Sequence, residues 1–138
     1  AQLKKLDSII ESRTNNFKIQ KNFFEKYSDF FSMPCQLPNS NTAWMMFPVV
    51  INDDAPFKRK DFQIYLEERN IQTRPVFTGN VIRQPICKNM EFKTNVSGYP
   101  NADRIMRGGV LLPVHHGMDE KMFESLHNVI DEFININK

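Results

Sequence analysis

The stretch GGVLLPVHHGMDEKMFESLHNVIDEF, residues 108–133, combines an apolar strand pattern with the clearest helix pattern of the chain. Residues 108–114 are almost all apolar, which is typical of a buried strand. Asp119 is placed to cap the helix that follows, and apolar side chains then recur every three or four positions. These side chains are Met122, Leu126, Val129, Ile130 and Phe133. The stretch therefore predicts a domain that mixes strands with helices.

A second apolar stretch, AWMMFPVVI at residues 43–51, has the aromatic and β-branched composition of a strand. Helical spacing follows it, with Asp53 or Asp54 as the expected cap and Asn70 as the expected end of the helix. Residues 71–76 have the composition of a short extended segment. These elements predict a strand, a helix and a further short strand.

The first thirty residues place apolar or long side chains in alternating steps of three and four, as on one stripe of a helix. The stripe consists of Leu3, Leu6, Ile10, Arg13, Phe17, Gln20, Phe24, Tyr27 and Phe31. A continuous helix over residues 2–30 would span about 45 Å, which exceeds the diameter of a domain of this size. We therefore expect its N-terminal apolar side chains to be covered by another domain or a second copy, or to remain as an exposed patch.

The order of these elements predicts an α+β fold, with helices on one face of a three-stranded sheet. Residues 1–31 form the expected long connecting helix, and the two prolines, the asparagines and the serines of residues 32–42 indicate a linker. Residues 43–138 form the expected small α+β domain.

Composition narrows the class of protein. The chain has 138 residues, of which 41% are hydrophobic and 25% charged, as in one globular domain. Its net charge of +2 is too balanced to indicate a nucleic-acid binder, and no apolar run is long enough to predict a membrane span. Cys35 and Cys87 fit neither a disulfide framework nor a metal pattern, so we expect free thiols in the cytoplasm. The N-terminus has no signal peptide and no initiator Met, which favours a piece of a longer protein.

Basic residues concentrate in the middle of the chain. Residues 69–107 contain seven basic and two acidic side chains, whereas residues 1–68 contain nine of each. The basic ones are Arg69, Arg74, Arg83, Lys88, Lys93, Arg104 and Arg107. Residues 77–101 lack clean periodicity, and such irregular stretches often carry function. The segment is either a solvated basic loop or a site for an anionic ligand, and the coincidence of charge and irregularity favours the ligand.

Residues for self-contained catalysis are scarce. His115 and His116 are adjacent, His127 lies on the last predicted helix, and no cluster of ligands completes a metal site. Cys87 follows the basic residue Arg83 and is either a reactive thiol of lowered pKa or, more often for such a residue, a small apolar filler. No phosphate-binding glycine motif is present. We expect no catalytic residue and no metal in this chain.

Residues 74–85, RPVFTGNVIRQP, carry a specific resemblance. They are similar to the R-P-[LV]-F-x-G-N-x-x-R-Q-P signature in the C-terminal domain of pyridoxal-phosphate-dependent NDP-4-keto-6-deoxyhexose 3-dehydrases, of the DegT/StrS sugar-aminotransferase superfamily. Supporting blocks follow in the family's order at residues 2–13, 57–73, 99–103 and 112–118. The resemblance thus covers almost the whole chain.

This resemblance implies the small C-terminal domain of a fold-type-I enzyme whose large N-terminal domain binds pyridoxal phosphate. The whole enzyme would deoxygenate C3 of a CDP-4-keto-6-deoxyhexose, in dideoxysugar and O-antigen biosynthesis. It would be a cytoplasmic homodimer that pairs with an iron–sulfur reductase. The lysine or histidine that works on the cofactor in such enzymes maps onto no residue of this chain.

The resemblance also implies five substrate-binding residues. Arg74 and Arg83 would contact phosphate or sugar oxygens, Asn80 would hydrogen bond through its amide, and Phe77 would line the sugar or cofactor pocket. His115 is the fifth, because residues 112–115 are similar to a Leu-Pro-x-His strand of the aminotransferase branch. A nucleotide-sugar aminotransferase is therefore the alternative within the superfamily.

Simpler roles remain open for some of these residues. Arg74 could form a salt bridge with Glu67 or Glu68, and Gly79-Asn80 is also expected to form a turn. An RNA-binding module is the alternative from another class of protein. It would place exposed aromatic rings among basic residues, whereas the strand around Trp44 has no interleaved Lys or Arg.

Overall fold

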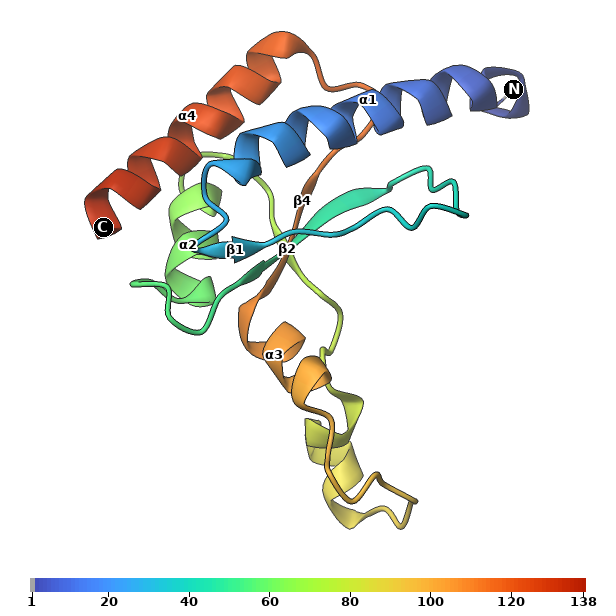
Figure 1. Cartoon of the computed structure of the whole chain (residues 1–138), viewed down its shortest axis with the longest axis vertical. Helices are drawn as coiled ribbons and strands as arrows, with labels where there is room; N and C mark the ends of the chain where they lie inside the picture. The colour runs from blue at the N-terminus through green and yellow to red at the C-terminus, as the bar shows by residue number, and fades with distance from the viewer. Residues whose placement is uncertain (1) are drawn as a thin grey trace.

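A computed structural model describes residues 2–138, in which one antiparallel sheet is surrounded by helices (Figure 1). The α-helices are α1 (Leu6–Glu25), α2 (Arg59–Glu67), α3 (Pro100–Gly108) and α4 (Glu120–Asn137). The strands are β1 (Phe31–Ser32), β2 (Met46–Ile51), β3 (Arg74–Pro75) and β4 (Gly109–Pro113). Short 3-10 helices span Gln2–Lys5, Val81–Arg83 and Pro85–Asn89. The α+β class is confirmed.

The sheet has four strands in the order β1-β2-β4-β3, rather than the three that the sequence predicts. In the central pair, Val49 lies opposite Val110 and Phe47 lies opposite Leu112. Successive side chains of a strand point to opposite faces, so these four residues share one face, and all four are buried. The additional strand is β1, in which Phe31 pairs with Ile51.

The hydrophobic core lies on this face and consists largely of phenylalanine rings. Phe24 packs against Phe31 and Phe47, and Phe62 of α2 contacts Phe133 of α4 with ring centroids 5.2 Å apart. Each fully buried ring contributes roughly 1.5–3 kcal/mol relative to an exposed one. Helices α1, α2 and α4 all contribute to this core, so they cover one face of the sheet as predicted.

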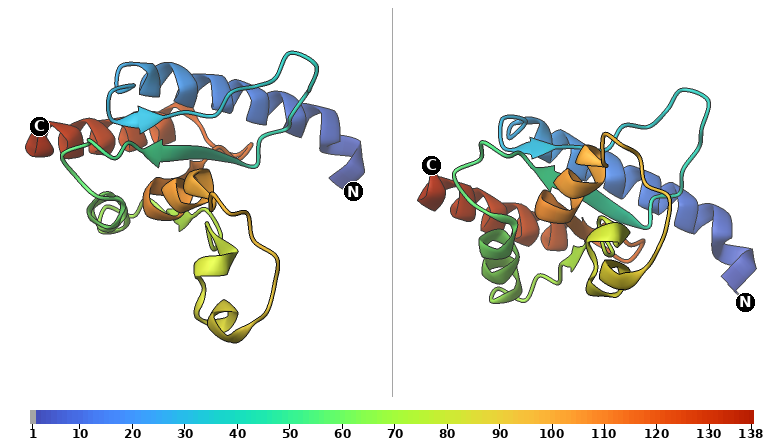
Figure 2. Two further views of the ribbon diagram at one scale, coloured as in Figure 1. Left: turned by 60° about the horizontal axis from the view of Figure 1, so that its bottom comes forward. Right: turned by 90° about the horizontal axis from the view of Figure 1, so that it is seen from below.

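Helix α3 lies on the opposite face, which the prediction of helices on one face did not include. A Cβ added at Gly109 would meet the carbonyl oxygen of Ile105 in α3 and the side chain of Val76. Gly109 points away from the face of Val110, because neighbouring residues in a strand alternate. In the left view of Figure 2, α1 and α3 lie on opposite sides of strand β2. The missing side chain at Gly109 lets α3 approach closely.

Helix α1 is shorter than the sequence predicts. It ends at Glu25, which corresponds to about 30 Å at 1.5 Å per residue. Phe31 continues the three-and-four spacing of the helix, but it is buried in strand β1 against Phe24. At the other end Leu3 is 85% exposed, so the apolar residues there lack a cover among residues 2–138.

The helix ends test the predicted caps. Asp119 caps α4 by accepting a hydrogen bond from the backbone N–H of Met122 at 2.9 Å, as predicted. Met122 itself is half-exposed rather than buried, and Phe123 is buried instead. The predicted cap of α2 by Asp53 or Asp54 is wrong, because α2 begins after Lys58 without a side-chain cap.

The C-terminus of α2 explains why Asn70 closes this helix. Asn70 has φ of 61°, a left-handed conformation that asparagine tolerates. The N–H groups of Asn70 and Ile71 then donate to the carbonyl oxygens of Glu67 and Leu66. The chain turns there towards strand β3.

Residues 77–99 project away from the sheet as a separate arm, seen at the bottom of Figure 1 and again in Figure 2. They contain the two short 3-10 helices Val81–Arg83 and Pro85–Asn89 and otherwise irregular chain, as the lack of periodicity predicts. No helix among residues 2–138 is long and apolar enough to cross a membrane.

Candidate functional site

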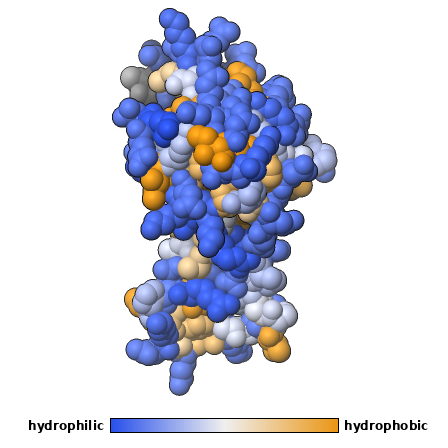
Figure 3. All heavy atoms as spheres, turned by 90° about the vertical axis from the view of Figure 1, so that its left-hand side faces the viewer, coloured by the Kyte–Doolittle hydropathy of each residue, from blue (hydrophilic) through white to orange (hydrophobic). Residues whose placement is uncertain are grey.

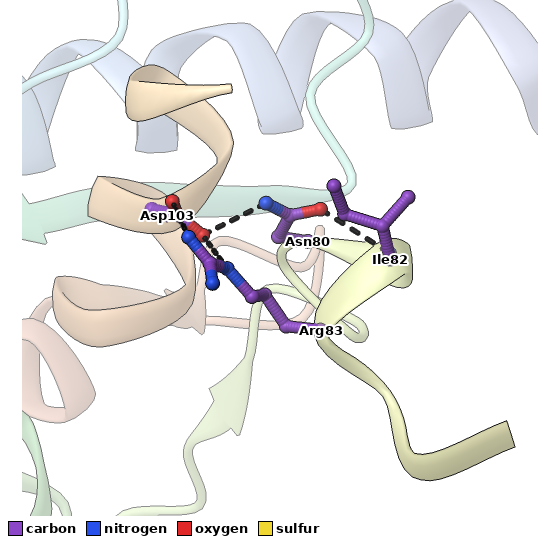
Figure 4. Close-up of polar contacts among 4 residues, drawn as sticks. All are labelled: Asn80, Ile82, Arg83 and Asp103. Atoms are coloured by element: carbon purple, nitrogen blue, oxygen red, sulfur yellow. Dashed lines mark hydrogen bonds and ion pairs between the residues drawn. The ribbon is translucent and has the colours of Figure 1, made fainter. Parts of the chain in front are cut away.

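Two side chains of the 74–85 signature, Asn80 and Arg83, meet Asp103 of helix α3 (Figure 4). Asn80 donates its amide N–H to Oδ1 of Asp103 at 2.8 Å. Arg83 donates from Nε to Oδ1 of Asp103 at 3.1 Å and from Nη2 to Oδ2 at 2.9 Å. The carboxylate thus accepts three hydrogen bonds, two of them from one guanidinium in a forked geometry. We call Asn80, Arg83 and Asp103 the α3 clamp.

The clamp also closes a turn of the loop. Oδ1 of Asn80 accepts the N–H of Ile82 at 3.2 Å, which caps the first 3-10 helix of the arm. Gly79 has φ of +65°, and a Cβ added there would overlap the backbone of Met106 in α3. The expected turn at Gly79-Asn80 is therefore present, and only glycine fits the first of these positions.

The charges of the clamp stabilise one another. Hydrogen bonds from Arg83, and then from Asn80, hold the pKa of Asp103 below its usual value. The same contact raises the pKa of Arg83 above its usual value. Both groups are therefore charged near neutral pH, and much of the positive charge of Arg83 is balanced by Asp103.

Phe77 is almost fully exposed to solvent. Its side chain is 90% exposed, and its backbone has φ of 44°. A left-handed backbone costs a non-glycine residue roughly 1–2 kcal/mol. An exposed ring on an unfavourable backbone is a recognised feature of functional sites, where other contacts hold the conformation.

Other exposed apolar side chains lie along the same arm. They are Val81, Ile86, Met90, Phe92, Val96 and Tyr99. On the face shown in Figure 3, small hydrophobic patches are separated by hydrophilic residues, on the main body and on the arm below it.

Arg74 and His115 lie in a different place, along a groove of about 640 Å³ at the edge of the sheet. Its lining includes Met45, Met46, Leu111, Pro113, Met118 and Met122. Arg74 takes part in none of the ion pairs found among residues 2–138, so the expected bridge to Glu67 or Glu68 is absent there. Nδ1 of His115 accepts the N–H of Gly117 at 3.2 Å.

The five predicted residues therefore form two groups. Asn80 is only 4% exposed, and both ends of its amide are engaged within the chain. Arg83 is engaged on one side and open on the other, with 62% of its side chain exposed. Arg74 and His115 share the groove, and Phe77 projects from the turn between the two groups. Their contact with substrate remains a prediction.

Structural contacts absorb most of the basic excess of residues 69–107. Arg107 pairs with Asp53, and Arg104 donates to the side-chain oxygens of Ser32 and Asn52. The guanidinium of Arg69 lies 3.4 Å from the ring centroid of Tyr65 and forms a longer ion pair with Glu132. Together with Arg83, four of the five arginines bond to side chains of the described residues. Arg74 donates from Nη1 to the backbone carbonyl of Thr73 at 2.9 Å and takes part in no ion pair among residues 2–138, so its charge is available to an anionic ligand.

Cofactor and metal chemistry find little support in the described part of the chain. Every lysine in residues 2–138 is exposed, whereas a lysine that forms an imine is activated in an enclosed position. These residues do not by themselves fit pyridoxal phosphate. No three His, Cys, Asp or Glu side chains of the described residues cluster as metal ligands, and Cys35 and Cys87 are free thiols.

Comparison with known proteins supplies the family. Residues 1–133 match the DegT/DnrJ/EryC1/StrS aminotransferase family. The chain belongs to this family. Its enzymes depend on pyridoxal phosphate. The resemblance of the 74–85 signature is thereby confirmed, and the RNA-binding alternative loses its basis, since Trp44 also stacks on Phe17 with ring centroids 4.1 Å apart.

Two curated relatives illustrate the similarity. The lipopolysaccharide biosynthesis protein RfbH of Salmonella typhimurium is 28% identical over 137 residues, which cover 99% of this chain and 31% of that protein. The GDP-4-keto-6-deoxy-D-mannose 3-dehydratase of Yersinia pseudotuberculosis is 26% identical over 130 residues, which cover 94% of this chain and 32% of that enzyme. The chain spans about a third of the length of these relatives.

Solved structures show the same fold. An aminotransferase from Psychrobacter cryohalolentis superimposes with a TM-score of 0.82 at 17% identity, over 99% of this chain and 37% of that one. The Escherichia coli GDP-4-keto-6-deoxy-D-mannose-3-dehydratase with bound hydrated PLP gives 0.75 at 24% identity, over 93% of this chain and 32% of that one. The architecture described above therefore matches about a third of these solved chains.

Sequence reasoning missed Asp103 and the groove. Asp103 is one of two acidic residues within the basic segment 69–107, and that isolation was the available signal for a partner of the arginines. The groove left no such signal, because its walls come from segments that are distant in the sequence and meet only through the fold of the sheet.

Proposed function

We propose that this chain is the small domain of a pyridoxal-phosphate-dependent enzyme that acts on nucleotide-linked sugars, and that it closes over the substrate. The carrying observation is the loop of residues 74–85, which is anchored to α3 by the clamp and yet presents Phe77 almost fully to solvent. An anchored loop with an exposed ring can meet a ligand without paying a large ordering cost.

The proposed reaction is C3 deoxygenation of a CDP-4-keto-6-deoxyhexose, in dideoxysugar synthesis for the O-antigen. The support is the 28% identity to RfbH over nearly the whole chain, together with relatives described as 3-dehydratases. The cofactor chemistry then belongs to a large domain outside this chain. We also propose a cytoplasmic homodimer and an iron–sulfur reductase that supplies the two electrons for replacing the hydroxyl group by hydrogen.

Within this proposal the residues of this chain bind and shield the substrate. Arg74 at the groove contacts an anionic oxygen of the nucleotide, since its guanidinium forms none of the ion pairs found among residues 2–138 and bonds to the backbone carbonyl of Thr73. Phe77 covers the sugar and excludes water. Asn80 and Arg83 hold the loop, and Arg83 keeps N–H groups free on its exposed side.

A nucleotide-sugar aminotransferase remains the second candidate. It is favoured by the sequence Leu112-Pro113-Val114-His115, whose histidine lines the groove beside Arg74. In that case the product would carry an amino group, and the enzyme would need an amino donor such as glutamate.

The test uses the full-length enzyme that contains this chain, with pyridoxal phosphate, CDP-4-keto-6-deoxyglucose and a reductase. We expect a product that lacks one oxygen by mass spectrometry. An amino sugar formed with glutamate would favour the second candidate. Turnover by the isolated 138-residue chain would refute the proposal that the cofactor chemistry belongs to a large domain outside this chain.

Arg74→Ala in the full-length enzyme should raise KM at least about tenfold, as for a lost contact to a charged group. Arg107→Ala is the matched control, because Arg107 is equally cationic but pairs with Asp53 outside the groove. Equal KM values for the two variants would remove Arg74 from the substrate site.

A further inference from the structure

Helix α3 contacts the loop on one side and the sheet on the other. Asp103 and Met106, one turn apart, face the loop, where they meet the clamp residues and Gly79. Arg104 and Gly108 face the sheet, where Arg104 hydrogen bonds to Ser32 and Gly108 packs against Ile51. The carboxylate of Asp103 is therefore presented to the loop from a helix that is fixed on the main body.

The loop is held on both sides of Phe77. Before it, Arg74 and Pro75 pair with strand β4 opposite Leu111 and Val110. After it, Gly79 lies directly against Met106 of α3, and the clamp residue Asn80 follows. Phe77, with its left-handed backbone, therefore lies between two attached segments.

Asp103 is the common point of these contacts. Without its carboxylate, the amide of Asn80 would lose its acceptor while only 4% exposed, and a buried unpaired donor is costly. Arg83 would lose both bonds that fix the plane of its guanidinium. In the described chain the side chain of Arg83 bonds to Asp103 alone, which leaves three of its five N–H groups directed elsewhere.

We propose that Asp103 is a positioning residue of the substrate site. It acts on the substrate through Arg83, by orienting the open side of that guanidinium, and it does not itself touch the substrate. This inference rests on the proposed function, because it takes the 74–85 loop to be the part that meets the nucleotide-sugar. It goes further by assigning a role to a residue outside that signature.

A purely stabilising ion pair is the competing explanation. An exposed pair such as Arg83–Asp103 contributes little to stability by itself. The two explanations differ in what they predict, because a positioning role changes substrate affinity through Arg83, whereas a stabilising role changes only the unfolding midpoint.

The experiment compares four variants of the full-length enzyme: Asp103→Ala, Arg83→Ala, the double variant, and Asp103→Glu, which keeps the carboxylate. Asp53→Ala is the matched control, because it breaks an ion pair of α3 that does not reach the loop. KM and kcat are measured with CDP-4-keto-6-deoxyglucose. Amide exchange of Ile82, whose N–H is bound by Asn80, is followed in the same variants.

We expect Asp103→Ala to raise KM about tenfold with kcat within about twofold, and to accelerate exchange at Ile82. Asp103→Glu should recover most of the affinity, and the double variant should match the worse single variant, because both act through one guanidinium. Asp103→Asn provides the same comparison if the alanine variant does not fold.

A KM for Asp103→Ala equal to that of Asp53→Ala would overturn the inference, even if exchange at Ile82 increased. Multiplied effects in the double variant would also overturn it, because they would mean that Asp103 acts independently of Arg83. If the unmodified enzyme acts only on another nucleotide-sugar, the substrate in the proposed function is wrong, and the same comparison on that sugar still decides the role of Asp103.

Discussion

Gly79→Ala should release the loop from α3. The new Cβ would overlap the backbone of Met106, which cannot move without displacing the helix. The left-handed backbone at φ of +65° adds roughly 1–2 kcal/mol for a residue with a Cβ. Shifting the helix to relieve the overlap adds a cost typical of overpacking, about 1–3 kcal/mol. The docked state should lose about 3 kcal/mol, or roughly a hundredfold in population.

Gly98→Ala is the matched control for this change. Gly98 is also left-handed, with φ of +71°, but its added Cβ would have no heavy atom within 4 Å. It should therefore show the backbone cost without the loss of docking. The assay is amide exchange over residues 77–89, together with KM of the full-length enzyme. If both variants gave the same exchange rates and the same KM, the close approach of Gly79 to α3 would not be what holds the loop.

Two further predictions concern the main body. Burial lowers the pKa of His127 to about 4 and outweighs the nearby charge of Asp131, which raises it, while Lys26 lowers it further. The imidazole is therefore neutral in the folded chain at neutral pH. Because this value lies below that of an unfolded histidine, about 6.5, the contribution is present above pH 6.5 and is lost as pH falls towards 4. After allowance for screening of a partly exposed ring, this histidine should make the free energy of unfolding in urea about 1–2 kcal/mol larger at pH 7.5 than at pH 5. His127→Gln should remove that difference. If the variant kept the same pH dependence, the lowered pKa of His127 would not be its cause. Asp119→Ala should lower the free energy of unfolding by about 1 kcal/mol, because α4 loses its cap. Asp119→Asn keeps an acceptor for the N–H of Met122 and should lose much less stability. Equal losses for the two variants in thermal denaturation would argue against the cap.

The sequence predicted the helix ends and strands whose structure depends on a few neighbouring residues. The cap at Asp119, the apolar run of β4 and the left-handed end of α2 at Asn70 are all visible within a few residues of sequence. Strand β1 was not predictable in this way. Phe31 fits the helical spacing of α1, and only pairing with Ile51, twenty residues later, makes it a strand.

The candidate site also combines features that local sequence predicts with features that depend on distant residues. The sequence located the signature loop, and the structure confirms its turn, because Gly79 and Asn80 determine it locally. The use of the arginines was not predictable, because Asp53 and Glu132, the partners of Arg107 and Arg69, lie far away in the sequence. A count of charges along the chain cannot separate arginines that bind ligands from arginines that hold the fold.

Helix α3 carries an arginine that holds the fold and also the carboxylate that holds the loop. Arg104 attaches α3 to Ser32 and Asn52 at the end of the sheet, while Asp103 attaches the loop to α3. The Arg107–Asp53 pair is largely exposed and adds little to this attachment. The loop is therefore attached to the main body through this helix and through the two residues of strand β3. A change that loosens the sheet side of α3, such as Arg104→Ala, should consequently disturb exchange at Ile82 although no atom of Arg104 is among the contacts of the clamp. If exchange at Ile82 were unaffected by that change, the loop would be fixed by β3 and its own turn, and α3 would not transmit the position of the sheet to the site.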